Sequence, residues 1–337
     1  MSLSGLLLMS CCNSKTPHRP AHHTANGFQN PWLREQEPGF GDMIKWQRTS
    51  ERESLPDTEE LEYLFPIVSP DWEAIRNPGA ALQVTWVGHA TLLIQMDGVN
   101  ILTDPMFSER CSPFRFTGPK RYRPLPFPVD SLPPIDLILI SHDHYDHLDR
   151  QTVRALGNAP RWLVPLGLKK WFHKQGLTNV QEKDWWDEVV YKDLTIVCTP
   201  ARHFSGRAPF NRNRTLWCSW TVLGMNHRIH FTGDTGYCPV FKEIGTKYGP
   251  FDLAAIPIGT YAPRWFMQSS HVTPVEAVQI NKDLQAKRLI ATHFGTFILA
   301  DNPVGEPPIL LKQAITEAGL KDREFILPRH GETFILP

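Results

Sequence analysis

The chain has 337 residues, of which 41% are hydrophobic, so it can build a sizeable core in one large domain or two small ones. Its 35 basic and 35 acidic side chains cancel, which excludes the basic excess typical of nucleic-acid-binding proteins. No apolar run approaches the roughly 20 residues that a transmembrane helix needs. The six cysteines are scattered and form no C-x-x-C pair, so they do not predict a disulfide framework.

The N-terminus allows two interpretations. The stretch from Leu6 to Cys11 resembles the end of a bacterial lipoprotein signal, with small Ser10 directly before the cysteine that would carry the lipid. No Lys or Arg precedes this apolar run, and the run is short for a signal peptide, so a chance match is the alternative. We therefore expect a membrane-associated protein, peripheral or lipid-anchored through Cys11, with a soluble cytoplasmic protein as the alternative.

Residues 1–27 form the first of three expected segments, and their polar part, 13–27, is predicted to be a disordered tail. Residues 28–80 form an arm that wraps the main domain, because aromatic side chains recur there among prolines and charges. A regular helix is expected only from Thr58 to Leu64, capped by Asp57. The histidines of the tail are expected to be solvated rather than metal ligands: His18, His22 and His23.

The main domain is expected over 81–337, where strands come first and then alternate with helices, in two rough halves, 81–232 and 233–337. The expected strands are 83–87, 92–96, 100–103, 136–140, 162–164, 180–182, 194–198, 217–223, 228–232, 253–257, 288–292, 325–327 and 333–335. The expected helices are 150–156, 166–175, 240–247, 274–284 and 307–318, the first capped by Asp149 and the fourth by a capping box at Thr273 and Glu276.

A long proline-rich loop, 105–134, interrupts the first half of this domain. It mixes aromatic and basic residues, which would suit the rim of a lipid-phosphate site, although a surface loop pinned by buried aromatics is an equal alternative. The tryptophans further on could line an acyl channel, but such aromatics more often form core, and we favour core. These residues are Trp185, Trp186, Trp217, Trp220, Trp265 and Phe266.

The most informative stretch follows the apolar strand that ends at Ile140. His142 and His144 are two residues apart, so in extended chain both imidazoles face the same side. Asp146 and His147 follow after a turn and can face a second point nearby. A metal needs three or four ligands, so two pairs predict two adjacent metals, completed by later residues. A polar turn is the alternative, but uncompensated buried polar groups cost about 1–3 kcal/mol each.

Three further candidate ligands stand just past the ends of predicted strands: His203, Asp234 and His293. In layered α/β folds, sites gather at that edge of the sheet. Two other turn residues, Asp104 and His89, are expected to orient the ligand histidines, with plain packing as the rival for His89. His330 is a weaker candidate for the same role.

These residues carry a family resemblance. The motif H-x-H-x-D-H, an isolated later histidine, G-D-T-G and T-H-F-G resemble the metallo-β-lactamase superfamily. More specifically, the chain resembles the N-acylphosphatidylethanolamine-hydrolysing phospholipases D over essentially 81–337. Matching stretches are 84–91, 118–121, 144–149, 162–168, 233–239, 249–259, 263–267 and 271–272, with Asn30-Pro31-Trp32 echoing the family's arm.

The resemblance implies an α/β protein, an αβ/βα four-layer sandwich of the metallo-β-lactamase type, with two Zn²⁺ at one edge. It implies a first zinc on His142, His144 and His203, a second on Asp146, His147 and His293, and Asp234 bridging both. It further implies catalytic roles for His271 and Tyr145 beside Asp146, with Tyr145 pointing into the same pocket. After His203 the family pattern Trp-Cys-Lys-Arg is replaced by Phe204-Ser205-Gly206-Arg207, and the loss of a basic contact there puts detailed substrate preference in doubt.

The function implied is that of a zinc-dependent phosphodiesterase of phospholipase D type. It would hydrolyse N-acylphosphatidylethanolamine-type phospholipids to N-acylethanolamine and phosphatidic acid through a hydroxide between the metals. Its partners would be the phospholipid and a membrane surface, with no nucleic acid, and a homodimer is left open. The rivals are another hydrolase of this fold, such as a sugar-phosphate lactonase, and a membrane-tethered binding protein with a degenerate site.

Overall fold

The computed structural model describes residues 19–32, 37–208, 210–321 and 324–336. The expected lipoprotein signal with Cys11, and His18 of the tail, lie outside these residues. Among the described helices, none combines the length and the apolar composition needed to cross a membrane.

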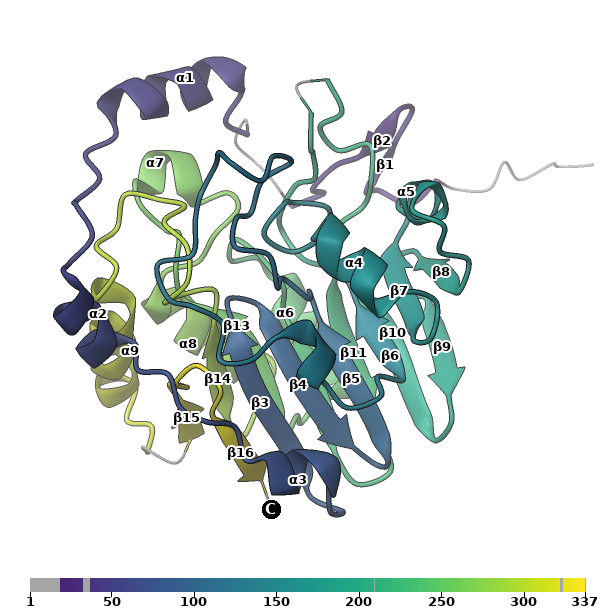
Figure 1. Cartoon of the computed structure of the whole chain (residues 1–337). Coiled ribbons are helices and arrows are strands. Elements are labelled where there is room, and N and C mark those ends of the chain that lie inside the picture. Colours follow the sequence, from purple (N-terminus) through teal and green to yellow (C-terminus); the bar gives the residue numbers. More distant parts are fainter. Residues whose placement is uncertain (1–18, 33–36, 209, 322–323, 337) are drawn as a thin grey trace, which may run out of the picture.

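Two seven-stranded sheets form the centre of the molecule (Figure 1). Both mix parallel and antiparallel neighbours. In spatial order, the first sheet contains β16 (Thr333–Leu336), β3 (Leu82–Gly88), β4 (Thr91–Met96), β5 (Val99–Thr103), β6 (Leu137–Leu139), β7 (Arg161–Pro165) and β8 (Val180–Lys183). The second contains β15 (Phe325–Ile326), β14 (Leu289–Thr292), β13 (Leu253–Pro257), β12 (Arg228–Phe231), β11 (Ser219–Leu223), β10 (Leu194–Thr199) and β9 (Glu188–Tyr191).

Side chains alternate between two apolar layers along the strands of the first sheet. In β4, Leu92 and Ile94 enter the core shared by the two sheets, whereas Leu93 faces a separate outer core. Leu137 and Ile138 of β6 divide in the same way. Because successive side chains of a strand point to opposite faces, an almost wholly apolar strand must be covered on both sides.

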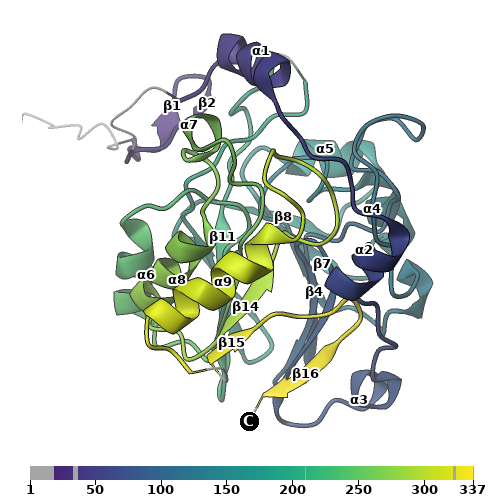
Figure 2. The same cartoon turned by 90° about the vertical axis from the view of Figure 1, so that its left-hand side faces the viewer.

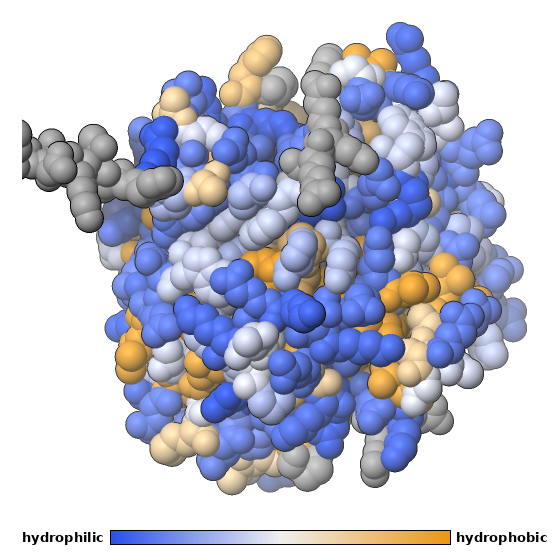
Figure 3. All heavy atoms as spheres, turned by 180° about the vertical axis from the view of Figure 1, so that it is seen from behind, coloured by the Kyte–Doolittle hydropathy of each residue, from blue (hydrophilic) through white to orange (hydrophobic). Residues whose placement is uncertain are grey.

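Helices provide the outer cover, so the architecture is the expected αβ/βα sandwich (Figures 1 and 2). Over the first sheet lie α3 (Trp72–Arg76), α4 (Arg150–Leu156) and α5 (Lys169–Lys174), with η1 (Val129–Ser131) in the long loop. Over the second lie α6 (Val240–Tyr248), α8 (Pro274–Asp283) and α9 (Glu306–Glu317). The face seen in Figure 3 is mostly hydrophilic, with hydrophobic residues in small patches.

The predicted division into halves at 232 and 233 is wrong. The chain passes from the first sheet to the second between β8 and β9, near Asp184, and β16 returns at the end to pair with β3. The reason is that β10, β11 and β12 are an antiparallel meander that also belongs to the second sheet.

The arm holds more helix than expected. The predicted helix is present as α2 (Thr58–Leu64), and the Asp57 carboxylate accepts from the Glu60 N–H at 2.9 Å. The structure adds α3, capped by Asp71, and α1 (Phe40–Thr49). Short helices depend on tertiary packing: Trp46 of α1 stacks on Phe266 of α7 (Arg264–Met267), with ring centroids 5.0 Å apart.

Part of the expected disordered tail is ordered. β1 (His23–Thr24) and β2 (Gly27–Phe28) form a hairpin, and the Nε2 atoms of His22 and His23 each lie 2.7 Å from a different oxygen of Asp184. His22 also stacks on Trp185 at 4.2 Å. The solvated interpretation is therefore wrong for His22. Local composition could not predict this hydrogen bond and ring stack, because both partners lie far away in the sequence.

Other differences are small. β9 and α7 were not predicted, and α5 begins at Lys169 rather than at 166, because Gly167 has a φ of +90° that no right-handed helix accommodates. Trp185, Trp217 and Trp220 are buried in the core, as favoured, whereas Trp265 is 42% exposed and Phe266 lines a cavity.

Candidate metal centre

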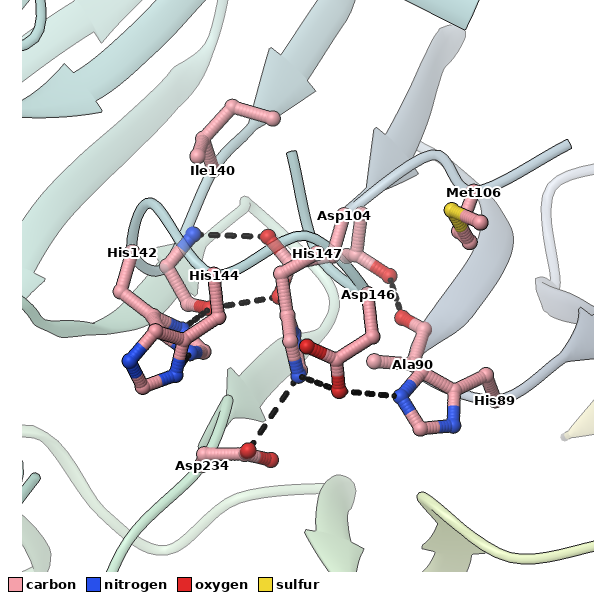
Figure 4. A network of polar contacts seen from close by, with 12 residues as sticks. His89, Ala90, Asp104, Met106, Ile140, His142, His144, Asp146, His147 and Asp234 are labelled. Carbon is pink, nitrogen blue, oxygen red and sulfur yellow. Dashed lines mark hydrogen bonds and ion pairs between the residues drawn. The ribbon is translucent and has the colours of Figure 1, made fainter. Parts of the chain in front are cut away.

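The loop after β6 carries four of the candidate ligands. Its chain turns because the N–H groups of His147 and Leu148 both donate to the carbonyl of His144, at 3.2 and 2.9 Å. This turn separates His142 and His144 from Asp146 and His147, as their spacing predicted (Figure 4). The residues therefore face two neighbouring points.

The first point lies among His142, His144 and His203. His142 Nε2 is 2.8 Å from His144 Nδ1, which is 3.2 Å from His203 Nε2. Burial lowers the pKa of His203 to about 3 and that of His144 to about 4, and it also lowers the pKa of His142. All three imidazoles are therefore neutral at pH 7, the form that binds metals.

Hydrogen bonds identify which nitrogens carry lone pairs. His203 Nδ1 lies 2.9 Å from the Ser270 carbonyl, to which it can only donate, so its Nε2 bears the lone pair. Ser141 Oγ donates to Asp104 at 2.5 Å, so it accepts from His142 Nδ1, which lies 2.9 Å from this hydroxyl oxygen. His142 Nε2 therefore also bears a lone pair. Lone pairs of buried nitrogens thus converge on one point, an arrangement that a cation stabilises.

The second point lies among Asp146, His147 and His293. Asp146 Oδ2 is 3.2 Å from His147 Nε2 and 3.3 Å from His293 Nε2. Burial opposes charge on His293, but Asp234 and Asp146 outweigh it and raise the pKa of His293 to about 9. The same balance raises the pKa of His147. This part of the centre therefore favours added positive charge.

Asp234 lies between the two points. Its Oδ2 is 3.1 Å from His293 Nε2, 3.2 Å from His147 Nε2 and 3.9 Å from His203 Nε2, while its buried Oδ1 has no hydrogen-bond partner among the described residues. The preceding Gly233 has a φ of +61°, and a Cβ there would lie 2.5 Å from Ser141 Cβ. Glycine is therefore what lets Asp234 approach the loop after β6.

The structure thus brings together all seven predicted ligands, from both sheets. The donor set, five imidazoles with two carboxylates, is of the kind that zinc and similar metals prefer. Asp234 Oδ1, a buried atom that no donor of the described residues reaches, is one that a cation would satisfy. The residues present fit a metal centre.

Asp104 and His89 support this centre in different ways. His147 Nδ1 donates to Asp104 Oδ2 at 2.7 Å, so Asp104 orients a candidate ligand as predicted. His89 contacts Asp146 Oδ2 at 2.8 Å and therefore orients a carboxylate rather than a histidine. His330 packs against Trp86, with ring centroids 4.3 Å apart.

A cavity of about 220 Å³ opens over the centre and is reached by His144, Asp146, Asp234, His271 and His293. Its apolar walls are Pro38, Trp46, Phe204, Phe266, Met267 and Leu299. Burial lowers the pKa of His271 to about 3, so this imidazole is neutral at pH 7, contrary to a protonated role. Its Nδ1 lies 3.9 Å from Asp234 Oδ2 and has no hydrogen-bond partner in the part of the chain that the structure describes.

Tyr145 does not lie in this cavity, so the prediction that it points into the same pocket is wrong. Its hydroxyl donates to the Arg207 carbonyl at 3.0 Å, and the Arg207 guanidinium lies 4.1 Å from its ring centroid. Its neighbours His144 and Asp146 turn toward the metal centre, whereas Tyr145 lines a different cavity, beside α4.

Sequence reasoning missed Arg212. Its guanidinium lies 4.1 Å from the Phe204 ring centroid and 3.1 Å from Glu37, at the cavity wall. It supplies a positive charge near the position where Phe204-Ser205-Gly206-Arg207 departs from the family pattern. The only signal was the basic loop after His203, and that loop did not show which arginine reaches the cavity.

Comparisons with known proteins agree with this geometry. Residues 99–294 match the model of the β-lactamase superfamily domain. A possible metal-dependent hydrolase from Veillonella parvula has the same fold, with a TM-score of 0.62, 18% identity, and coverage of 76% of this chain and all of that one. The fold and the site define a metal-dependent hydrolase of the metallo-β-lactamase superfamily.

Two relatives identify the family within this superfamily. The chain is 41% identical over 312 residues to N-acyl-phosphatidylethanolamine-hydrolyzing phospholipase D 1 of Caenorhabditis elegans, covering 88% of this chain and 87% of that protein. It is 36% identical over 268 residues to the mitochondrial enzyme of that name from Saccharomyces cerevisiae, covering 76% of this chain and 57% of that protein. The chain belongs to the family of N-acyl-phosphatidylethanolamine-hydrolysing phospholipases D.

Proposed function

We propose that this hydrolase is a zinc-dependent phosphodiesterase that cleaves N-acylphosphatidylethanolamine-type phospholipids into N-acylethanolamine and phosphatidic acid. One observation carries the proposal: a cavity with largely apolar walls opens directly onto the two-point centre. The relatives named for this reaction, one of them 41% identical, support the same substrate class.

The chain's own residues supply sites for two ions. His142, His144 and His203 would hold the first, and Asp146, His147 and His293 the second, with Asp234 shared between them. Bound zinc supplies Lewis acidity and lowers the pKa of water to about 7, which provides hydroxide at neutral pH.

Residues around the centre would position the phosphodiester. His271 Nδ1 is buried and makes no hydrogen bond within residues 19–32, 37–208, 210–321 and 324–336, so it would hydrogen-bond to a phosphoryl oxygen. Arg212, which also pairs with Glu37, lies at the cavity wall, where its guanidinium would hydrogen-bond to the phosphate. The apolar side chains of Trp46, Phe266 and Met267 exclude water and would contact the lipid portion nearest the phosphate.

The same features weigh against the rivals. A sugar-phosphate lactone would favour a polar pocket that pairs its hydroxyl groups, whereas six apolar side chains line this one. A binding protein with a degenerate site would be expected to have lost ligands, and here all seven are present and converge.

The test is product analysis with the purified full chain. With N-acylphosphatidylethanolamine, phosphatidylcholine and a sugar-phosphate lactone offered separately, we expect N-acylethanolamine and phosphatidic acid from the first, and about two zinc ions per chain by elemental analysis. His203→Ala should lose at least about a hundredfold in activity together with bound metal, because it removes a ligand rather than a supporting contact.

His173→Ala is the matched control, since this histidine is exposed on α5 and remote from the centre. It should retain full activity and metal content. Unchanged diesterase activity in a His203→Ala protein that has lost its metal would reject the mechanism, and turnover of the lactone alone would reject the substrate class.

A further inference from the structure

A second cavity, of about 790 Å³, lies between residues 107–115 and helix α4. Arginines surround it: Arg110, Arg115, Arg150, Arg154 and Arg207. Beside Arg115, the rings of Phe114 and Phe116 stand in solvent. We call Arg110, Phe114, Arg115, Phe116, Arg150 and Arg154 the arginine face.

The positive charge of the arginine face is local. The whole chain has equal numbers of acidic and basic residues, so no general basic excess explains it. Among the described residues that line the cavity, only two are carboxylates, and both are engaged: Asp149 accepts from Ser108 and Thr152, and Glu109 pairs with Lys120 at 2.8 Å. Within the described part of the chain, Arg115, Arg150 and Arg154 form no ion pair.

The two phenylalanine rings are exposed to solvent at the tip of an ordered loop. Phe114 is 55% exposed and Phe116 is 82% exposed, with ring centroids 5.9 Å apart. The ends of the loop beneath them are joined by a backbone β-bridge between Arg110 and Lys120. The Arg110 side chain also donates to the Gly118 carbonyl at 2.8 Å. Adjacent exposed aromatic rings are unfavourable in water and mark a surface that a partner covers.

The arginine face adjoins the catalytic cavity. Tyr145 lines the arginine-rich cavity, whereas its neighbours His144 and Asp146 line the cavity over the metal centre. In Figure 1 the loop between β5 and β6 rises at the same end of the sandwich as α1 and α7, which help to enclose the catalytic cavity.

The catalytic cavity is too small for a whole lipid. Its volume, about 220 Å³, is below the roughly 300–1,000 Å³ of pockets that enclose drug-sized ligands. The acyl chains of a phospholipid substrate must therefore remain outside it, and their most favourable surroundings are the bilayer. If the proposed function holds, on which this step rests, the protein works while seated on a lipid surface.

We propose that the arginine face docks the protein on an anionic phospholipid bilayer. Arg115, Arg150 and Arg154 would pair with headgroup phosphates, and Phe114 and Phe116 would insert at the level of the headgroups. Basic residues beside exposed aromatic rings are the combination that binds anionic membrane surfaces.

The experiment is vesicle sedimentation of the full chain, with phosphatidylcholine vesicles with and without phosphatidylglycerol. We expect binding that requires phosphatidylglycerol and weakens with added salt.

The double variant R150E/R154E should lower the partition coefficient by about tenfold or more, since each basic residue near an anionic surface contributes substantially. F114S/F116S should lower binding without altering its dependence on salt. The matched control, K242E/K312E, reverses two exposed charges on α6 and α9 and should bind as the wild type.

Activity measurements on soluble and vesicle-bound substrate distinguish this proposal from the proposed function. R150E/R154E should cleave a soluble short-chain N-acylphosphatidylethanolamine as the wild type does, while losing activity on vesicles. If no substrate is cleaved but binding follows the pattern above, docking stands and the proposed function fails. Vesicle binding unchanged in both double variants overturns docking. Loss of inorganic phosphate binding in R150E/R154E, with vesicle binding intact, would also overturn it and assign the arginine face to a soluble anion.

Discussion

Asp104 shows how one buried residue organises several others. Its carboxylate is fully buried and accepts from His147 Nδ1, from the Ser141 N–H at 2.7 Å and from the Ser141 hydroxyl. Through these bonds it sets the tautomers of His147 and, by way of Ser141, of His142. Sequence alone placed Asp104 in a turn after a strand, but could not show which histidine it orients.

Asp104→Asn keeps the shape of the side chain but replaces one acceptor oxygen by a donor. We expect zinc affinity to fall about 10- to 100-fold, because His147 loses the acceptor that fixes its ring. Competition against a chromophoric chelator measures this affinity. Asp136→Asn is the control, since Asp136 pairs with Lys192 away from the centre. Equal loss in both variants would show a general structural effect.

His230 is a buried histidine outside the metal centre, in β12. Its Nδ1 is 2.9 Å from Thr221 Oγ1, and burial lowers its pKa to about 3. The unfolded chain binds a proton near pH 6.5, whereas the folded chain does not until about pH 3. The free energy of unfolding must therefore decrease as pH falls from about 6.5 toward 3.

His230→Gln should reduce this pH dependence. Between pH 7 and pH 5 the wild type is expected to lose about 2 kcal/mol more stability than the variant, as judged by urea unfolding. A His230→Gln curve parallel to that of the wild type would contradict the assignment of a neutral buried imidazole.

Among the elements, α6 packs closely against the C-terminal end of α8. A Cβ at Gly245 of α6 would lie 2.0 Å from the Asp283 carbonyl oxygen and 2.9 Å from Leu284 Cα. Both are backbone atoms, so no side-chain rotation can relieve the contact. At Gly41 of α1, by contrast, such a Cβ would meet no described atom within 4 Å outside its own stretch of helix.

The same substitution should therefore act in opposite directions at these two positions. Gly245→Ala is expected to destabilise the protein by about 1–3 kcal/mol, because α6 must move away from α8. Gly41→Ala should stabilise it by about 0.5–1 kcal/mol, because glycine in a helix costs conformational entropy. Urea unfolding of both variants measures these changes, and a stable Gly245→Ala protein would contradict the packing.

At the scale of the whole molecule, the metal centre joins the two sheets. His142, His144, Asp146 and His147 follow a strand of the first sheet, whereas His203, Asp234 and His293 follow strands of the second. Bound metal would therefore stabilise the association of the sheets and not only the local loops.

Chelation should accordingly lower the thermal stability of the whole chain. With free zinc about 100- to 1,000-fold above its dissociation constant, the folded state gains about 3–4 kcal/mol. Calorimetry with excess chelator, and again after zinc is restored, should show a reversible drop in Tm, and His203→Ala should show a smaller one. Equal Tm values in zinc and in chelator would contradict a metal that links the sheets.

The sequence by itself determined most strands, most helices and the positions of the candidate ligands at strand ends. It could do so because strand alternation, helix caps and ligand spacing are local patterns. The tertiary structure decided the pairing of β16 with β3, the helices of the arm, the outward position of Tyr145, and the places of His22 and Arg212. These features depend on contacts between residues far apart in the chain, and local composition does not show which distant residues a segment will contact.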